Sequence, residues 1–195
     1  MKTDIILCGV GGQGILSIAA AIGLAALDKK LKVKQAEVHG MSQRGGAVQS
    51  HLRLSDRIIA SDLIPYGGAD IILSVEPMES LRYLPYLSPD GWLLTNTATF
   101  ENIPNYPETD KIQEEIRKVK KHVMINADEI AREAGSLKAS NMVMLGAGSF
   151  FTGIEKDYFT GAIEKLFKTK GEDIINMNIL AFEKGENAAR NYRTN

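Results

Sequence analysis

The sequence is poor in the residues that bind metals. It has one cysteine, Cys8, and three histidines among its 195 residues. An iron–sulfur cluster takes about four thiolates, so this chain cannot hold one alone, and an internal disulfide is excluded. No three His, Cys, Asp or Glu residues show the spacing of metal ligands. We therefore expect no metal, and a lone thiol favours a reducing compartment.

Charge of one sign and long apolar runs are also missing. The 23 basic and 24 acidic residues give a net charge of -1, which is no electrostatic basis for binding nucleic acid. The apolar runs are too short for a membrane span, and the N-terminus shows no signal-peptide pattern. We expect a cytoplasmic protein with no nucleic-acid or membrane partner.

The hydrophobic pattern predicts an α/β fold. Thr3–Cys8 indicates a buried strand, Gly14–Asp28 a helix rich in small residues, and Leu31–Val38 a second strand. Such a βαβ opening implies a parallel sheet. We expect further strands and helices downstream: a half-exposed strand at Val48–Leu54, a short strand at Ile58–Ile59, strands at Asp70–Val75, Trp92–Thr95 and Val123–Asn126, and helices at Pro77–Leu87 and Lys111–Lys121.

Helical patterns dominate from Ala127 onward, and Phe100–Thr109 is rich in Pro and Asn, which is typical of a flexible loop. The predicted fold is a Rossmann-like open, mostly parallel sheet with flanking helices and a helical C-terminal third. We expect one domain over 1–195, with its helical part at about 127–195.

A glycine-rich motif joins the first strand to the first helix, with residues Gly9, Val10, Gly11, Gly12, Gln13 and Gly14. Glycines in this context allow backbone N–H groups to approach a diphosphate at a helix N-terminus. Glu37 ends the next strand, near the spacing of a ribose-binding acid. The alternative is a turn that only packs helix on strand, and a Cβ branch at Gly12 should then crowd it. Ile15 and Leu16 occupy the places of the Lys and Ser/Thr of a P-loop, so this motif is not the phosphate-binding loop of an NTPase.

A second polar segment, EVHGMSQRGG, follows the second strand. It holds an acid, an imidazole, an amide and a guanidinium at Glu37, His39, Gln43 and Arg44, with Met41 and Gly45 between and beside them. The loop after the second strand of an open sheet lies near its carboxyl edge, beside the glycine loop. Arg44 would suit an anion or a partner surface, although a solvated loop explains the same glycines.

Other candidates have simpler explanations. His51 lies in a strand and His122 follows a run of lysines, so both are expected to be structural or on the surface. Cys8 is expected to be a buried core thiol. Glu76 and Asn96 each follow a buried strand and fit either a ligand crevice or a helix or turn cap.

These segments resemble the γ-type domain of the 2-oxoacid:ferredoxin oxidoreductases. The likeness rests on GVGGQG, EVHGMSQRGG, QSHLRL, SDLIPYGGADIILSVEPMESLRYLPYL and NMVMLGAG, which together span well over two-thirds of the chain. EVHGMSQRGG is the most specific piece and is most similar to the indolepyruvate type, whose relatives for pyruvate and 2-oxoglutarate tend to carry another loop before RGG.

The resemblance implies a division of labour. Thiamine diphosphate and iron–sulfur clusters would belong to a larger catalytic subunit, which decarboxylates an aryl 2-oxoacid, reduces ferredoxin and passes the acyl group to coenzyme A. This chain, which also lacks a GDG-type thiamine diphosphate motif, would cover the partner's active-site region. By motif match, Glu37, His39, Gln43, Arg44 and Gly45 would face that region.

Two other functions fit parts of the sequence. The glycine spacing and Glu37 also suit a stand-alone NAD-dependent dehydrogenase or a nucleotide-binding regulatory module. Against the dehydrogenase, no second domain is large enough to hold a substrate. A γ subunit for pyruvate or 2-oxoglutarate is the nearest variant of the favoured function.

Overall fold

The computed structural model describes residues 1–39 and 45–194. Its six strands are β1 Lys2–Val10, β2 Lys32–His39, β3 Ala47–Ser55, β4 Ala69–Ser74, β5 Leu87–Asn96 and β6 His122–Ile125. The helices are α1 Ile15–Asp28, α2 Pro77–Arg82, α3 Thr109–Arg117, α4 Ala127–Glu133, α5 Ser140–Thr152, α6 Lys156–Phe167 and α7 Glu172–Thr194. Short 3-10 turns occur at η1 Leu84–Tyr86, η2 Leu137–Ala139 and η3 Lys168–Lys170.

The strands form one sheet in the order β2-β3-β1-β4-β5-β6. β1, β4, β5 and β6 pair in parallel, whereas β3 is antiparallel to both β1 and β2. The predicted open, mostly parallel sheet is confirmed, but β2 does not pair with β1 as the βαβ pattern suggested. The chain turns back after β2, and the returning strand β3 takes the place beside β1.

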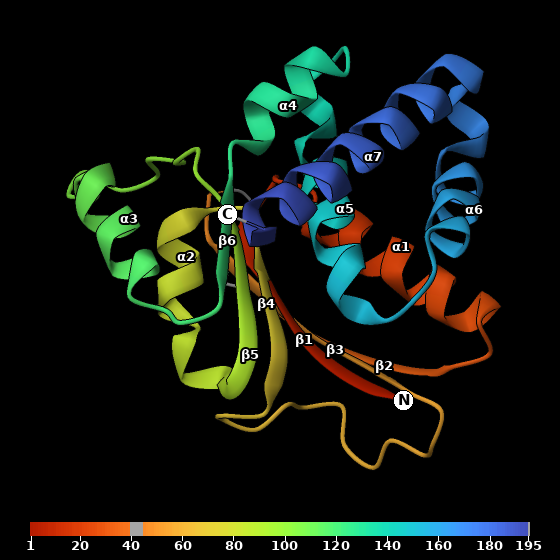
Figure 1. The fold of residues 1–195 in the computed structure, drawn as a ribbon, viewed down its shortest axis with the longest axis horizontal. Coiled ribbons are helices and arrows are strands. Elements are labelled where there is room, and N and C mark those ends of the chain that lie inside the picture. Colours follow the sequence, from red (N-terminus) through yellow and green to blue (C-terminus); the bar gives the residue numbers. More distant parts are fainter. Residues whose placement is uncertain (40–44, 195) are drawn as a thin grey trace.

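Helices cover the two faces of this sheet unequally (Figure 1). On one face, α2 and α3 pack over a core that includes Ile6, Cys8, Ile112 and Ile116. On the other face, α1 and the C-terminal helices cover a larger core. The helical C-terminal third is therefore confirmed, and nearly all of it lies on the α1 side.

Local elements differ from the sequence pattern in three places. Ile58 and Ile59 form no strand, and the Ile58 side chain is 84% exposed. The helix expected over Pro77–Leu87 ends at Arg82 and continues as η1, because proline at position 85 cannot donate the next helical hydrogen bond. β5 begins at Leu87, five residues before the strand expected at Trp92–Thr95.

β3 is buried rather than half-exposed, because it lies between β2 and β1. His51 is 3% exposed, and its Nδ1 accepts a hydrogen bond of 3.0 Å from the Ile64 N–H. Its ring meets Tyr86 edge-on, with 5.3 Å between the ring centroids. The structural role expected for His51 follows directly, since the ring fixes the segment after β3 against the sheet.

α5 and α7 approach each other closely at two glycines. A Cβ on Gly146 would lie 1.9 Å from the Phe182 carbonyl oxygen, and one on Gly185 would lie 2.0 Å from the Val143 carbonyl oxygen. Real Cβ atoms do not come so near backbone, so any side chain here would push the helices apart.

None of the helices in the described part of the chain has both the length and the apolar character that a membrane span needs.

Replacing Gly185 with alanine should therefore destabilise the fold. We expect Gly185→Ala to lower the free energy of unfolding by about 1–3 kcal/mol through overpacking. Gly161→Ala is the matched control, because a Cβ on this helical glycine of α6 meets nothing within 4 Å. The control should be neutral or stabilising by up to about 1 kcal/mol. Urea titrations would measure both, and equal stability of the two variants would contradict the close approach.

The environment of His51 predicts a pH dependence of stability. Burial, and secondarily the Arg53 cation, lowers the pKa of His51 below its ordinary value. As the pH falls below about 6.5, the unfolded chain takes up a proton that the folded state refuses. Stability is therefore full above that pH and falls below it, by at most about 1.4 kcal/mol per pH unit, until the folded-state pKa is reached.

His51→Asn keeps an acceptor for the Ile64 N–H and removes the titrating ring. Chemical denaturation between pH 5 and pH 7 should show a smaller loss of stability on acidification in His51→Asn than in the wild type. Parallel pH profiles for the two proteins would show that His51 is not the group responsible.

Candidate functional site

The predicted glycine loop lies between β1 and α1. Gly14 is the N-cap of α1 with φ 82°, in the left-handed region, and its carbonyl accepts from the N–H groups of Ser17 and Ile18 at 3.0 and 3.3 Å. A Cβ on Gly14 would lie 2.4 Å from the Asn141 Nδ2, and one on Gly9 would lie 2.3 Å from the Val75 Cγ2. These two glycines are required by close approach of α5 and of the residue after β4.

Gly12 departs from the expectation. A Cβ there would meet nothing within 4 Å, so crowding of the strand–helix turn is the wrong reason for this glycine. Its φ of 105° is the actual constraint, because side-chain-bearing residues rarely adopt such a backbone.

The carboxyl ends of β1 and β4 define the usual ligand crevice of this architecture. The chain leaves β1 toward α1 on one face of the sheet and leaves β4 toward α2 on the other (Figure 1). In open α/β sheets, ligands bind at such a switch point. This places the glycine loop at the expected location.

A side chain of the protein itself bridges that crevice. Gln13 Oε1 accepts from the Val10 N–H at 2.8 Å, and Gln13 Nε2 donates to the Val75 carbonyl at 3.5 Å. The Asn96 amide, from the end of β5, donates to the same Val75 carbonyl at 3.5 Å. The two amides thus satisfy backbone groups that a bound diphosphate or its waters would otherwise meet.

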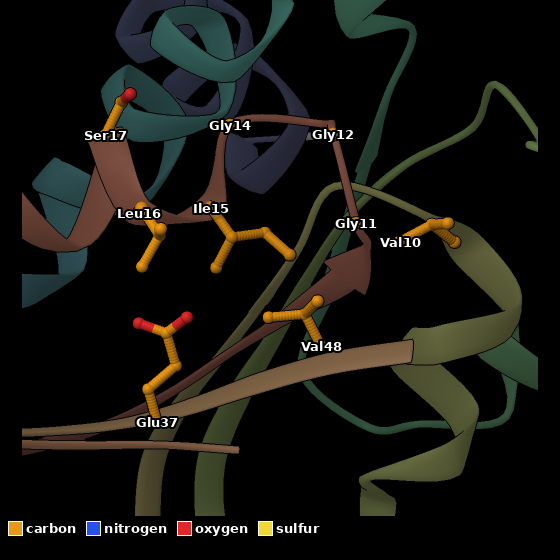
Figure 2. Close-up of a pocket in the computed structure, with 9 residues that line it drawn as sticks. All are labelled: Val10, Gly11, Gly12, Gly14, Ile15, Leu16, Ser17, Glu37 and Val48. Atoms are coloured by element: carbon orange, nitrogen blue, oxygen red, sulfur yellow. The ribbon is translucent and has the colours of Figure 1, made fainter. Parts of the chain in front are cut away.

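The glycine loop and Glu37 nevertheless line one cavity, of about 330 Å³. Figure 2 shows the Glu37 carboxylate pointing toward the first turn of α1, where Ile15 and Leu16 lie, with Val48 beside it. Because β3 lies between β1 and β2, Glu37 is two interstrand spacings, roughly 10 Å, from the β1 line. The lining is mainly apolar, with one carboxylate: Val10, Gly11, Gly12, Gly14, Ile15, Leu16, Ser17, Glu37 and Val48.

The second predicted segment is described only at its two ends. β2 runs to His39, and the chain is described again from Gly45. The predicted site residues Met41, Gln43 and Arg44 lie outside the described residues. Beyond them, Gly45 N–H donates to the Gly11 carbonyl at 3.2 Å, and Gly11 N–H donates to the Gly46 carbonyl at 2.8 Å. The segment therefore returns to the sheet directly against the glycine loop, as its position after the second strand predicted.

Glu76 and Asn96 act as caps, the simpler of the two explanations considered for them. Glu76 is fully buried at the N-cap of α2, and its carboxylate accepts from the Glu79 N–H at 2.8 Å. The same carboxylate accepts from the Tyr106 hydroxyl, and burial followed by this hydrogen bond raises the Tyr106 pKa. Asn96 Oδ1 accepts from the N–H groups of Ala98 and Ala127 at 3.2 and 3.0 Å.

The loop between β5 and α3 also belongs to this region, which the sequence pattern did not indicate. Asn102 Nδ2 donates to the Gly45 carbonyl at 2.7 Å, which joins that loop to the exit of the second segment. The loop had been expected to be flexible because it is rich in Pro and Asn. It is held by hydrogen bonds from loop donors to acceptors far away in the sequence, and such contacts produce no periodic pattern.

Cys8 has the properties of a core residue. It is fully buried, and burial raises the pKa of its thiol far above the ordinary value. A protonated buried thiol is neither a nucleophile nor a cluster ligand. Within residues 1–39 and 45–194, no group of three or more His, Cys, Asp or Glu side chains is placed to hold a metal ion.

Comparison with known proteins agrees with this architecture. A family model described as pyruvate ferredoxin/flavodoxin oxidoreductase matches residues 4–188. Two similar relatives are both named indolepyruvate oxidoreductase subunit IorB. The chain is 38% identical to the one from Archaeoglobus fulgidus, covering 97% of this chain and 96% of that protein. It is 35% identical to the one from Methanothermobacter thermautotrophicus, covering 97% and 98%.

Among solved structures, the fold matches the 2-oxoglutarate:ferredoxin oxidoreductase from Magnetococcus marinus. That structure contains 2-oxoglutarate, coenzyme A and succinyl-CoA. The TM-score is 0.78 at 20% identity, over 97% of this chain and 31% of that one. The same fold therefore occurs there as one part of a longer polypeptide.

Proposed function

The chain belongs to the pyruvate ferredoxin/flavodoxin oxidoreductase family, and from this premise we propose that it is the small γ-type subunit of an indolepyruvate:ferredoxin oxidoreductase. The observation that carries the proposal is the similarity to two subunits of that name, at 38% and 35% identity over nearly the whole of each protein. Residues 1–195 would act as one γ-type domain within a heteromeric, cytoplasmic enzyme.

In this assignment the larger subunit carries out the chemistry. It would bind thiamine diphosphate and the iron–sulfur clusters, release CO₂ from an aryl 2-oxoacid, pass electrons to ferredoxin and transfer the acyl group to coenzyme A. The small chain would complete the surface against which that subunit works, and it would be inactive alone.

The residues of this chain do not fit the enzyme's redox cofactors. A cluster takes about four thiolates, and the chain has only Cys8, which is buried with a raised thiol pKa. The cofactors therefore belong to the partner in our proposal.

The partner-facing residues would be Glu37, His39, Met41, Gln43, Arg44 and Gly45. Support comes from the cavity that Glu37 shares with the glycine loop and from the anchoring of Gly45 on Gly11. Gly9, Gly11, Gly12, Gln13 and Gly14 would chiefly hold this surface in place, because the Gln13 side chain already uses the backbone groups of Val10 and Val75.

A nucleotide-binding function is the second candidate, and one observation favours it. The cavity of about 330 Å³ lies beside the N-terminus of α1 and includes Glu37, the elements of a dinucleotide site. NAD-dependent dehydrogenase activity or nucleotide-dependent regulation would require a ligand to fit beside the Gln13 bridge. Titration of the purified chain with NAD measures this directly.

We expect this chain to purify from its native cell extract with a larger subunit. The complex should contain iron and thiamine diphosphate and should reduce ferredoxin when supplied with indolepyruvate and coenzyme A. Preference for pyruvate or 2-oxoglutarate would retain the subunit role and contradict the indolepyruvate assignment. A homo-oligomer without iron that binds NAD would contradict the subunit role itself.

Arg44→Ala should lower kcat/KM of the reconstituted enzyme for the 2-oxoacid or coenzyme A. Loss of a guanidinium that pairs with an anionic group costs about 1.5–3 kcal/mol, or roughly ten- to a hundredfold. The control is Arg57→Ala, an exposed arginine after β3 at the opposite end of the sheet. Steady-state kinetics identical in both variants would remove Arg44 from the site.

A further inference from the structure

The loop between β5 and α3 reaches the edge of the site as a strap that hydrogen bonds hold in place. We define the strap as residues 97–108, which connect the two elements. At its start, the Thr97 N–H donates to the Ile125 carbonyl at 2.9 Å. Further along, the Phe100 N–H and the Tyr106 hydroxyl both donate to Glu76 Oε1. One carboxylate therefore holds the strap on both sides of Asn102.

Glu76 can hold the strap in one position because its side chain is shielded from solvent. It is fully buried, and its other oxygen is fixed by the Glu79 N–H at 2.8 Å. The position of Asn102 is thus set by the core under α2 and not by local loop propensity.

The Asn102 side chain joins the strap to the return of the second segment. Its Nδ2 donates to the Gly45 carbonyl at 2.7 Å, across 57 positions of sequence. Its Oδ1 is buried and has no hydrogen-bond partner among the described residues.

Gly45 is a residue that needs such a contact. Its φ is 78°, in the left-handed region, and a Cβ on it would meet no described atom within 4 Å. The Gly11 carbonyl holds its N–H and Asn102 holds its carbonyl. With its N–H and its carbonyl both held, the Gly45 backbone is fixed at the point where the described chain resumes.

We propose that Asn102 is a positioning residue, which fixes the Gly45 carbonyl and thereby sets how the chain leaves the partner-facing segment. The reaction it serves rests on the proposed function. The hydrogen bond itself does not, because it is a property of this chain alone. A misplacement of about 1 Å near reacting groups costs up to a hundredfold in rate, so a single amide here would have a measurable effect on turnover.

The first test uses the full chain without a partner. The Gly45 N–H donates to the Gly11 carbonyl, and its exchange should become about two- to tenfold faster in Asn102→Ala, because the Gly45 carbonyl then loses the hydrogen bond that holds the same residue. Asn102→Asp keeps the size and removes the N–H donor, so it should behave like Asn102→Ala. Asn105→Ala is the matched control, because Asn105 is an exposed asparagine of the same strap. All three variants should keep the wild-type melting temperature within about 3 °C.

The second test uses the complex reconstituted with the larger subunit. Asn102→Ala and Asn102→Asp should lower kcat/KM by about ten- to a hundredfold while the affinity for the partner stays within about threefold. Asn105→Ala should match the wild type. The loss should appear for the 2-oxoacid or coenzyme A, and the KM for ferredoxin should stay unchanged. A merely structural change would be expected to alter the KM for ferredoxin as well.

The outcomes separate the two levels of the proposal. Unchanged exchange at Gly45 in both Asn102 variants, or wild-type behaviour of Asn102→Asp, overturns the positioning role whatever the enzyme does. Faster exchange with wild-type kinetics overturns its importance for the reaction. A wild-type complex that turns over no 2-oxoacid overturns the proposed function and leaves the exchange result to decide the role of Asn102 within the chain.

Discussion

The rest of the structure depends on how the carboxyl ends of β1 and β4 are bridged, and the Gln13 side chain bridges them. Connections leave these two neighbouring strands toward opposite faces of the sheet, and the β1–β4 pairing ends with the hydrogen bond of 3.0 Å from the Val75 N–H to the Cys8 carbonyl. Gln13 satisfies the Val10 N–H and contributes to the Val75 carbonyl, where the Asn96 amide also donates. A ligand commonly occupies this place in related architectures, and here the protein supplies its own polar groups.

Because Gln13 bridges these strand ends, the glycine loop has a structural role. With the crevice bridged, Gly11 pairs with Gly45 and Gly46 by continuing the β1–β3 ladder past the ends of the strands. The loop thus becomes a support for the segment that returns from β2. From the other side, the strap reaches Gly45 through Asn102 and is itself held by the buried Glu76. Gly45, at the described end of that segment, is therefore held from both sides within this chain, and groups that are already held lose less entropy on association.

The remaining fold keeps that edge rigid. α5 and α7 touch backbone to backbone at Gly146 and Gly185, and α5 also supplies Asn141, whose Nδ2 donates to the Gly14 carbonyl at 3.4 Å. The first turn of α1 is therefore braced by the C-terminal helices. Because the helices are distributed unequally, α1 and the C-terminal bundle support one side of the site and α2 with the strap supports the other (Figure 1). In the proposed function, a chain with one buried thiol and such a braced edge presents a surface, and the redox chemistry would fall to the partner subunit.

The sequence alone determined the class of fold, the place of the two glycine-bearing loops and the family. Strands with aliphatic runs, a glycine-to-helix transition and the EVHGMSQRGG loop are local patterns, and local patterns follow from the residues that compose them. Tertiary structure alone decided that β3 enters beside β1, that Gln13 fills the switch point, and that Asn102 reaches Gly45. Each of these joins residues far apart in the chain, or places a strand by competition for a neighbour. These contacts depend on which distant backbone groups lack a hydrogen-bond partner when the sheet forms, and no single stretch of sequence contains that information.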